Sequence, residues 1–503
     1  MPFARARIPT LASLGLLLVV VGLKADVGQG AAVVQLQLGQ LLVTEGRYAD
    51  AAEAYERAWR GGDRPTRLEA GRGLLVAWLR TAEFRRARDL SDELVALAPA
   101  DPAVIALRGD ALWAAGQFDL AEARYRDALT LAPGQPRARN GLAKTLAARS
   151  QLEAALDEAS AAVTAAPREA EFHHTLGYLY QRLRRFPEAA TAYSSYINLL
   201  PNKDRSEQAL WARQQVRYLQ SFGTRVPSEI EGDSPDLRLT MPFRLVRDKI
   251  IVQARVNGGA PSNFVLDTGA ELTVVTKRTA ERAGITPIVY TLSAGVGQVG
   301  LRGLQLGRMD SFQIGPLTLT NVPTLIKNPP LTDLPTREAE SFSPLAYGLS
   351  VAIDYRNRVL TIGRSLDEQP AAVELPLHLH RLAMVKGFLN GDQPVHFVVD
   401  TGGEVISISR ATLDTIAVPP AARRIPLKVY GVSGWDPSAF LLPGMHLAFD
   451  EVKLSNLPVV VLDLGAPSVL LGFELGGTVG HRFLSKYSIA IDLQRSVLRL
   501  SSS

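Results

Sequence analysis

The sequence predicts a multidomain protein in which an all-α repeat solenoid precedes two tandem, mostly β domains that pair with each other. Three observations predict this fold. Four prolines in the first half recur every 34 residues, two segments in the second half align without a gap, and a polar stretch separates the halves. A chain of 503 residues also exceeds the size at which one hydrophobic core stops growing.

Composition narrows the classes of function. The chain has 55 basic and 50 acidic residues, and the resulting charge of +5 is too small and too dispersed to indicate a nucleic-acid partner. The absence of cysteine excludes a disulfide, a thiolate metal site and a thiol nucleophile. Seven histidines show no metal-ligand spacing, and no phosphate-binding glycine loop stands out. We therefore expect no metal and no cofactor.

Residues 1–30 have the pattern of an export signal. Arg5 and Arg7 precede an apolar run from Leu11 to Leu23. The run is short for a membrane span, and both a cleaved signal peptide and a retained N-terminal membrane anchor fit it. The sequence therefore predicts an exported protein, periplasmic or held at the extracytoplasmic side of a membrane.

A helical repeat occupies residues 31–222. The prolines with the 34-residue spacing are Pro99, Pro133, Pro167 and Pro201, and Ala87, Ala121, Ala155 and Ala189 each lie twelve residues before one of them. Tyr125 and Tyr193 keep the same phase. Small alanines let paired helices approach, aromatic rings fill the adjacent gaps, and proline ends the second helix of each unit.

This pattern resembles the tetratricopeptide repeat (TPR) family, with about five units between Ala31 and Pro201. The segment from Ser206 to Phe222 is expected to be a capping helix with a polar outer face. The resemblance implies that the array holds a segment of a protein partner on its concave face. Helical periodicity then stops, and we place a linker at residues 223–240.

The second half contains two copies of one β domain, at residues 241–367 and 368–503. Residues 256–276 align without a gap on residues 389–409, and both contain Asp-Thr-Gly between apolar strands. A second matched pair surrounds Pro323 and Pro458, and a third pairs residues 351–362 with residues 489–500. A turn repeated only because the domain was duplicated is the structural alternative for the two motifs.

The apolar strand, Asp-Thr-Gly-Ala and second apolar strand resemble the retropepsin-like aspartic peptidases. In that family each lobe supplies one aspartate and the two carboxyls meet at a two-fold axis. Here both lobes are in one chain, as in the pepsin-like arrangement. The resemblance implies that Asp267 and Asp400 are the catalytic pair of an aspartic endopeptidase acting on a protein or peptide substrate.

Peptide hydrolysis without a metal or covalent nucleophile needs a base that activates water and an acid that protonates the developing oxyanion and amine. Two adjacent carboxyls that share one proton supply both. Thr268 and Thr401 are expected to hydrogen-bond across the lobe interface. Gly269 and Gly402 are expected to let backbone amides approach the carboxylates.

By the same resemblance, a Gly-rich hairpin should fold over the substrate, and residues 293–300 and 429–436 are the candidates. Tyr430 and Trp435 line the cleft or, on the plainer interpretation, pack within their lobe.

Two departures make the lobes unequal. Copy two has Thr478-Val479-Gly480 under its active-site loop, whereas copy one has Ser341-Phe342 there and lacks the glycine. Copy two has Gly403 where serine or alanine is usual after the motif. The sequence therefore also admits a second function, a weakly active or inactive peptide-binding scaffold. A third arrangement, in which active sites form only between chains, also stays open.

Overall fold

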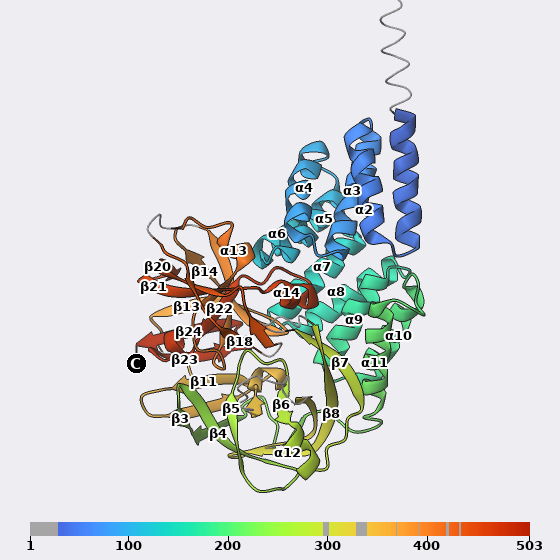
Figure 1. Cartoon of the computed structure of the whole chain (residues 1–503). Helices are drawn as coiled ribbons and strands as arrows, with labels where there is room; N and C mark the ends of the chain where they lie inside the picture. Colours follow the sequence, from blue (N-terminus) through green and yellow to red (C-terminus); the bar gives the residue numbers. More distant parts are fainter. Residues whose placement is uncertain are drawn as a thin grey trace, which may run out of the picture.

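The structure is a computed structural model that describes residues 29–294, 301–327, 340–368, 370–391, 393–418, 422–431 and 434–502. A helical array leads into two β lobes (Figure 1). This confirms the predicted fold class. Among the described residues no helix is both long and apolar enough to cross a bilayer. Residues 1–28 of the predicted leader lie outside the described part.

The array consists of antiparallel helix pairs. A helix over residues 29–44 comes first. It is followed by α2 (Tyr48–Gly61), α3 (Arg64–Arg80), α4 (Phe84–Leu97), α5 (Pro102–Ala114), α6 (Phe118–Leu131), α7 (Pro136–Ala148), α8 (Leu152–Ala165), α9 (Ala170–Arg182), α10 (Phe186–Leu199) and α11 (Glu207–Gln220). The four periodic prolines each lie two residues beyond the end of α4, α6, α8 or α10, because proline cannot continue a helix.

The periodic small residues are packing sites. The alanines of the 34-residue pattern are fully buried. Tyr125 in α6 lies against Gly109 and Gly141, where an added methyl group would collide with its ring. Glycine is therefore needed at these positions for space, and the tyrosines belong to the core rather than to a site.

The array curls on itself. Arg80 at the end of α3 forms an ion pair of 2.7 Å with Glu171 in α9. Asn202, which follows α10, donates a hydrogen bond to the carbonyl of Glu45, which follows the first helix. The early and late repeats are thus tied directly to each other.

Helix α11 caps the array and exposes polar residues, as expected, among them Glu207, Gln208, Arg217 and Gln220, but another side of it packs on the first lobe. Tyr218 donates a 3.0 Å hydrogen bond to the carbonyl of Gly307 in the first lobe. Tyr218 and Phe222 also share a buried cluster with Val289 and Leu306 of that lobe. The helix therefore has two roles, because it ends the array and also joins it to the first lobe.

The first lobe contains β2 (Arg238–Pro242), β3 (Arg244–Val246), β4 (Lys249–Val256), β5 (Ser262–Leu266), β6 (Thr273–Thr276), α12 (Lys277–Arg282), β7 (Val289–Ala294), β8 (Leu301–Ile314), β9 (Leu317–Lys327), β10 (Glu340–Phe342), β11 (Ser350–Asp354) and β12 (Val359–Gly363). Strands β4, β5, β10, β6, β9 and β8 close into a barrel. The predicted linker is partly structured, because β1 (Glu229–Ile230) pairs with β9.

The second lobe repeats this topology. It contains β13 (Val373–His380), β14 (Leu382–Leu389), β15 (Pro394–Asp400), β16 (Ser407–Ser409), α13 (Arg410–Leu413), β17 (Ile425–Pro426), β18 (Val429–Gly431), β19 (Gly434–Asp436), β20 (Phe440–Phe449), β21 (Val452–Leu462), α14 (Gly465–Leu471), β22 (Gly477–Gly480), α15 (His481–Leu484), β23 (Tyr487–Asp492) and β24 (Val497–Ser502). Strands β14, β15, β22, β16, β21 and β20 close the second barrel.

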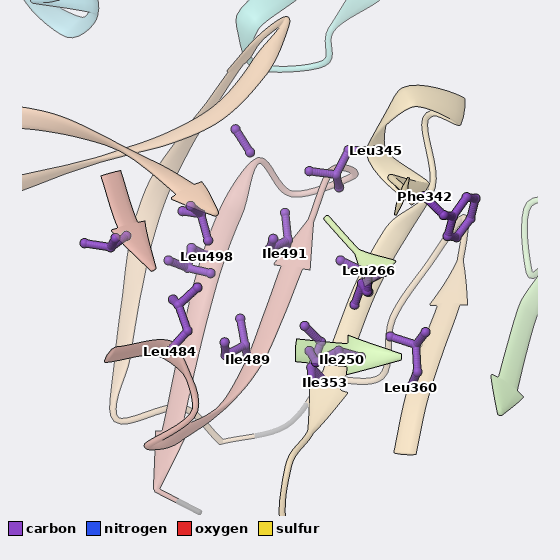
Figure 2. Packing of buried hydrophobic residues seen from close by; sticks show 14 of the residues in the cluster. Ile250, Leu266, Phe342, Leu345, Ile353, Leu360, Leu484, Ile489, Ile491 and Leu498 are labelled. Atoms are coloured by element: carbon purple, nitrogen blue, oxygen red, sulfur yellow. The ribbon is translucent and has the colours of Figure 1, made fainter. Parts of the chain in front are cut away.

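One antiparallel sheet joins the lobes in the order β2, β12, β11, β23, β24, β13. At its centre Ala352 of β11 pairs with Ala490 of β23, the residue that the duplication makes its equivalent. The local two-fold axis of the chain therefore passes through this pair. Figure 2 shows the core at this sheet, to which Ile353 and Leu360 of one lobe and Ile489 and Leu498 of the other contribute.

The array also packs on the second lobe. Phe118 and Leu142 of the array share a buried cluster with Met384, Val398 and Phe473 of the lobe. Arg182 in α9 donates a 3.1 Å hydrogen bond to the carbonyl of Leu379, close to the β13–β14 turn. Part of the array's surface is therefore occupied by the chain's own second lobe.

Candidate active site

The two Asp-Thr-Gly turns occupy equivalent places in the lobes. Asp267 directly follows β5 and Asp400 ends β15. Each turn connects two strands of its barrel and faces the other lobe. The structure thereby brings together two aspartates that are 133 residues apart in the chain. The arrangement in which active sites form only between chains is not the one seen here.

Four hydrogen bonds interlock the turns. The Thr268 amide donates to Thr401 Oγ1 and the Thr401 amide donates to Thr268 Oγ1, each at 3.1 Å. The hydroxyls continue across the interface, from Thr268 to the Val399 carbonyl at 2.5 Å and from Thr401 to the Leu266 carbonyl at 2.8 Å. Both threonines are buried. This two-fold network fixes the positions of the adjacent aspartates.

The motif glycines make room for the carboxyl of the opposite lobe. A methyl group at Gly269 would lie 2.6 Å from the Asp400 carboxyl, and one at Gly402 would collide with Asp267 in the same way. The Gly269 amide also donates to Asp267 at 3.1 Å, and the Gly403 amide donates to Asp400 at 2.8 Å. Each carboxyl thus has a backbone donor, and only glycine permits the approach between lobes.

The environment favours protonation of the pair. Burial, followed by the negative charge of Asp400, raises the pKa of Asp267 well above its usual range. Burial likewise raises the pKa of Asp400, which lies within hydrogen-bonding reach of Asp267. Two carboxyls this close cannot both ionise readily, so the pair holds a shared proton over a broad pH range.

The support under Asp267, where the first lobe lacks the glycine of the second, is rebuilt from other residues. Strand β10 pairs with β5 in the same parallel register that β22 uses with β15, so Ser343 occupies the position equivalent to Gly480. Gly480 has extended dihedral angles that any residue adopts, so it needs space rather than conformational freedom. Phe342 supports the turn directly, because its carbonyl accepts a 2.9 Å hydrogen bond from the Asp267 amide.

Gly403, the second departure, contacts the carboxyl of its own motif. A methyl group there would lie 2.6 Å from Asp400 Oδ2. The absence of a side chain therefore lets the Gly403 amide donate directly to Asp400.

Of the two candidate hairpins over the substrate, the one at residues 429–436 is described except for residues 432–433, which lie outside the described part. Strands β18 and β19 pair with Tyr430 opposite Trp435. Trp435 is half-buried, and its indole N–H has no partner among the described residues. In the first lobe β7 pairs with β8 as far as Ala294 and Leu301, and the intervening residues 295–300 lie outside the described part.

Sequence reasoning missed the charged residues beside the turns. Lys249, at the start of β4, donates a hydrogen bond across the lobes to the Gly402 carbonyl. Arg381, just before β14, forms a 2.8 Å ion pair across the lobes with Glu271, four residues after Asp267. Extending the gapless alignment seven residues upstream would have aligned Lys249 with Leu382 and exposed this difference. Among the described residues no cluster of three acidic or histidine side chains could hold a metal ion.

Comparisons with known proteins agree with both halves of the chain. A family model described as aspartyl protease matches residues 252–337 and 385–475, one segment in each lobe. A model described as tetratricopeptide repeat matches residues 36–102 and 107–170. The chain carries an aspartyl protease region behind N-terminal tetratricopeptide repeats. No curated protein matches the sequence of this TPR-containing chain.

Solved structures similar to the chain include TPR proteins. A thermophilic TPR protein from Thermus thermophilus is 21% identical, with a TM-score of 0.33, and the match covers 38% of this chain and all of that one. MamA from Desulfovibrio magneticus is 21% identical with a TM-score of 0.25, over 35% and 98% of the two chains. PilF from Pseudomonas aeruginosa is 16% identical with a TM-score of 0.28, over 39% and 86%.

Proposed function

We propose that the chain is an aspartic endopeptidase with one intramolecular active site, formed by Asp267 and Asp400. The observation that carries this proposal is the interlocked Thr268–Thr401 network, which holds two half-buried carboxyls within hydrogen-bonding reach of each other. A turn repeated only through duplication would have no need to face its copy. The match to the aspartyl protease model supports the same function.

In the proposed reaction the singly protonated pair binds a water molecule. The ionised carboxylate takes a proton from the water as its oxygen attacks the peptide carbonyl carbon, and the protonated carboxyl gives its proton to the carbonyl oxygen. Collapse of the tetrahedral intermediate breaks the C–N bond. The amine takes a proton from one carboxyl while a hydroxyl of the intermediate gives its proton to the other, so the pair is again singly protonated. Asp267 and Asp400 exchange roles during the cycle.

We also propose that the enzyme is exported and that its repeats recruit protein. The N-terminal pattern of Arg5, Arg7 and the run from Leu11 to Leu23 supports export. Because the β13–β14 turn of the second lobe lies against α9, a recruited protein would use surfaces of the array that the lobes leave open. An extended peptide substrate would bind between the lobes by adding a strand.

The test is cleavage of an unfolded-protein mixture by the full chain between about pH 3 and pH 8. We expect products from the wild type and their loss, by at least about 1000-fold, in Asp267→Asn and in Asp400→Asn, because either change removes one of two interdependent groups. The full chain is required because the array covers apolar surface of the second lobe. Folded wild-type protein that yields no products at any pH would instead favour a peptide-binding scaffold.

A further inference from the structure

Lys249 distinguishes the two halves of the otherwise symmetric site. It starts β4 in the first lobe and its ammonium group donates to the carbonyl of Gly402, within the Asp-Thr-Gly turn of the second lobe. The equivalent position in the second lobe is Leu382, at the start of β14. A symmetric site would have a cation at this position in both lobes or in neither, whereas here only the first lobe has one.

The local backbone fixes where Lys249 begins its strand. Val246 pairs with Lys249, and the two turn residues between them, Arg247 and Asp248, have φ of 52° and 57°. Such two-residue turns usually contain glycine or asparagine, since other side chains are strained in the left-handed region. In the second lobe a single residue, Arg381, separates the paired residues His380 and Leu382. Its guanidinium forms the ion pair with Glu271, whereas Glu404, the equivalent of Glu271, is exposed.

We propose that Lys249 is a positioning residue for the catalytic pair and that its ammonium charge stabilises the singly ionised state of Asp267 and Asp400. This inference rests on the proposed function. The hydrogen bond to Gly402 places the charge beside both carboxyls, because Gly402 itself packs against Asp267. Loss of this charge would shift the pair toward full protonation, in which neither carboxyl is a base.

The charged surroundings agree with this role. Burial has the largest effect on both aspartates and raises their pKa. Lys327 at the end of β9 and, to a smaller degree, Lys249 lower the pKa of Asp267, and Lys249 also lowers that of Asp400. His481 also lies near Lys249, and burial lowers the pKa of this histidine. The charges of Asp248, Lys249 and Glu404 act on His481 as well. Lys249 is joined to the Asp-Thr-Gly turn of the second lobe by its hydrogen bond to the Gly402 carbonyl.

The first test compares pH–rate profiles of the full chain. Lys249→Gln keeps a donor for the Gly402 carbonyl but removes the charge, and Lys249→Arg keeps the charge. Loss of a cation raises both pKa values of the pair, so we expect both limbs of the Lys249→Gln profile to move to higher pH by about one unit. Lys249→Arg should restore the wild-type limbs. The control Lys277→Gln, at an exposed lysine in α12, should leave them unchanged.

A Lys249→Gln profile with wild-type limbs would overturn the proposal and leave Lys249 as a support for the turn only. A second measurement does not depend on cleavage. Thermal unfolding of Lys249→Gln, Asp400→Asn and the double variant forms a cycle. We expect the losses of melting temperature caused by Lys249→Gln and by Asp400→Asn to be non-additive at pH 8 and closer to additive at pH 4. Additive losses at both pH values would overturn the proposal, whether or not the wild type cleaves peptides.

Discussion

Gly480 and Ser343 occupy equivalent positions at the ends of β22 and β10, but their surroundings differ. A methyl group at Gly480 would lie 2.6 Å from the Val405 carbonyl oxygen. Ser343 is fully buried, and its hydroxyl has no partner among the described residues. We expect Gly480→Ala to destabilise the protein by about 1–3 kcal/mol through overpacking. Ser343→Ala should be neutral or stabilising, since it removes an unsatisfied polar group.

Urea unfolding of the two single variants measures this difference. If Gly480→Ala and Ser343→Ala changed the free energy of unfolding equally, the second lobe would accommodate a side chain at Gly480 as the first lobe does at Ser343. The lobes would then be interchangeable at this point, which would contradict the expected difference in packing.

Residues that match between the two copies were predictable, and residues that differ were not. The alignment of Asp-Thr-Gly with itself identified Asp267, Asp400 and their neighbours, because a duplicated motif appears twice in one sequence. Lys249 has leucine as its equivalent, so the comparison of copies gave no signal for it. Its proximity to Gly402 arises only when β4 of one lobe meets a turn of the other.

At the scale of elements, the contact of β13 and β15 with the array contains buried histidines. His380 of β13 lies 5.2 Å from the ring of Trp113 in α5, and His396 of β15 lies 5.0 Å from that of Phe118 in α6. Burial lowers the pKa of both histidines to about 3. Nearby positive charges act in the same direction, chiefly Arg381 on His380 and His378 on His396.

This contact should weaken in acid. The unfolded chain binds protons at these histidines below about pH 6.5, whereas the folded chain does not until about pH 3, so stability is lost as the pH falls between those values. Each histidine should contribute a loss of about 1.4 kcal/mol per pH unit within that window. Thermal unfolding of the full chain from pH 8 to pH 4 measures the loss.

The variant His380→Phe should lose less stability over that range, because phenylalanine keeps the ring contacts and cannot be protonated. His446→Phe is the matched control, since His446 is exposed on β20. Identical acid sensitivity in wild type and His380→Phe would contradict this explanation.

The sequence period predicted the repeat helices but not what covers their end. The 34-residue spacing reports contacts between neighbouring repeats, which recur and therefore appear as a pattern. The contact of α11 with β7 and β8 occurs once, and its residues Tyr218 and Phe222 are ordinary core residues for a helix of this kind. Only the folded chain shows that their partner is the first lobe.

For the whole molecule, the array and the lobes share buried surface and should depend on each other. Met384, Val398 and Phe473 of the second lobe are nearly inaccessible, and they pack with Phe118 of the array. Removal of residues 1–223 exposes this apolar surface to water. We expect the remaining chain to bind a hydrophobic dye, to self-associate and to unfold at lower temperature than the full chain. A monomeric fragment with full-chain stability would contradict the assigned contact.

The central claim is that each chain forms one complete catalytic pair from its own two lobes. Mixing purified Asp267→Asn with Asp400→Asn, under conditions that unfold and refold them together, and measuring peptide cleavage tests it most directly. If the pair is intramolecular, each variant and the mixture stay inactive while refolded wild type cleaves. Activity that appears only in the mixture would mean that intact aspartates from different chains meet, and would contradict the claim.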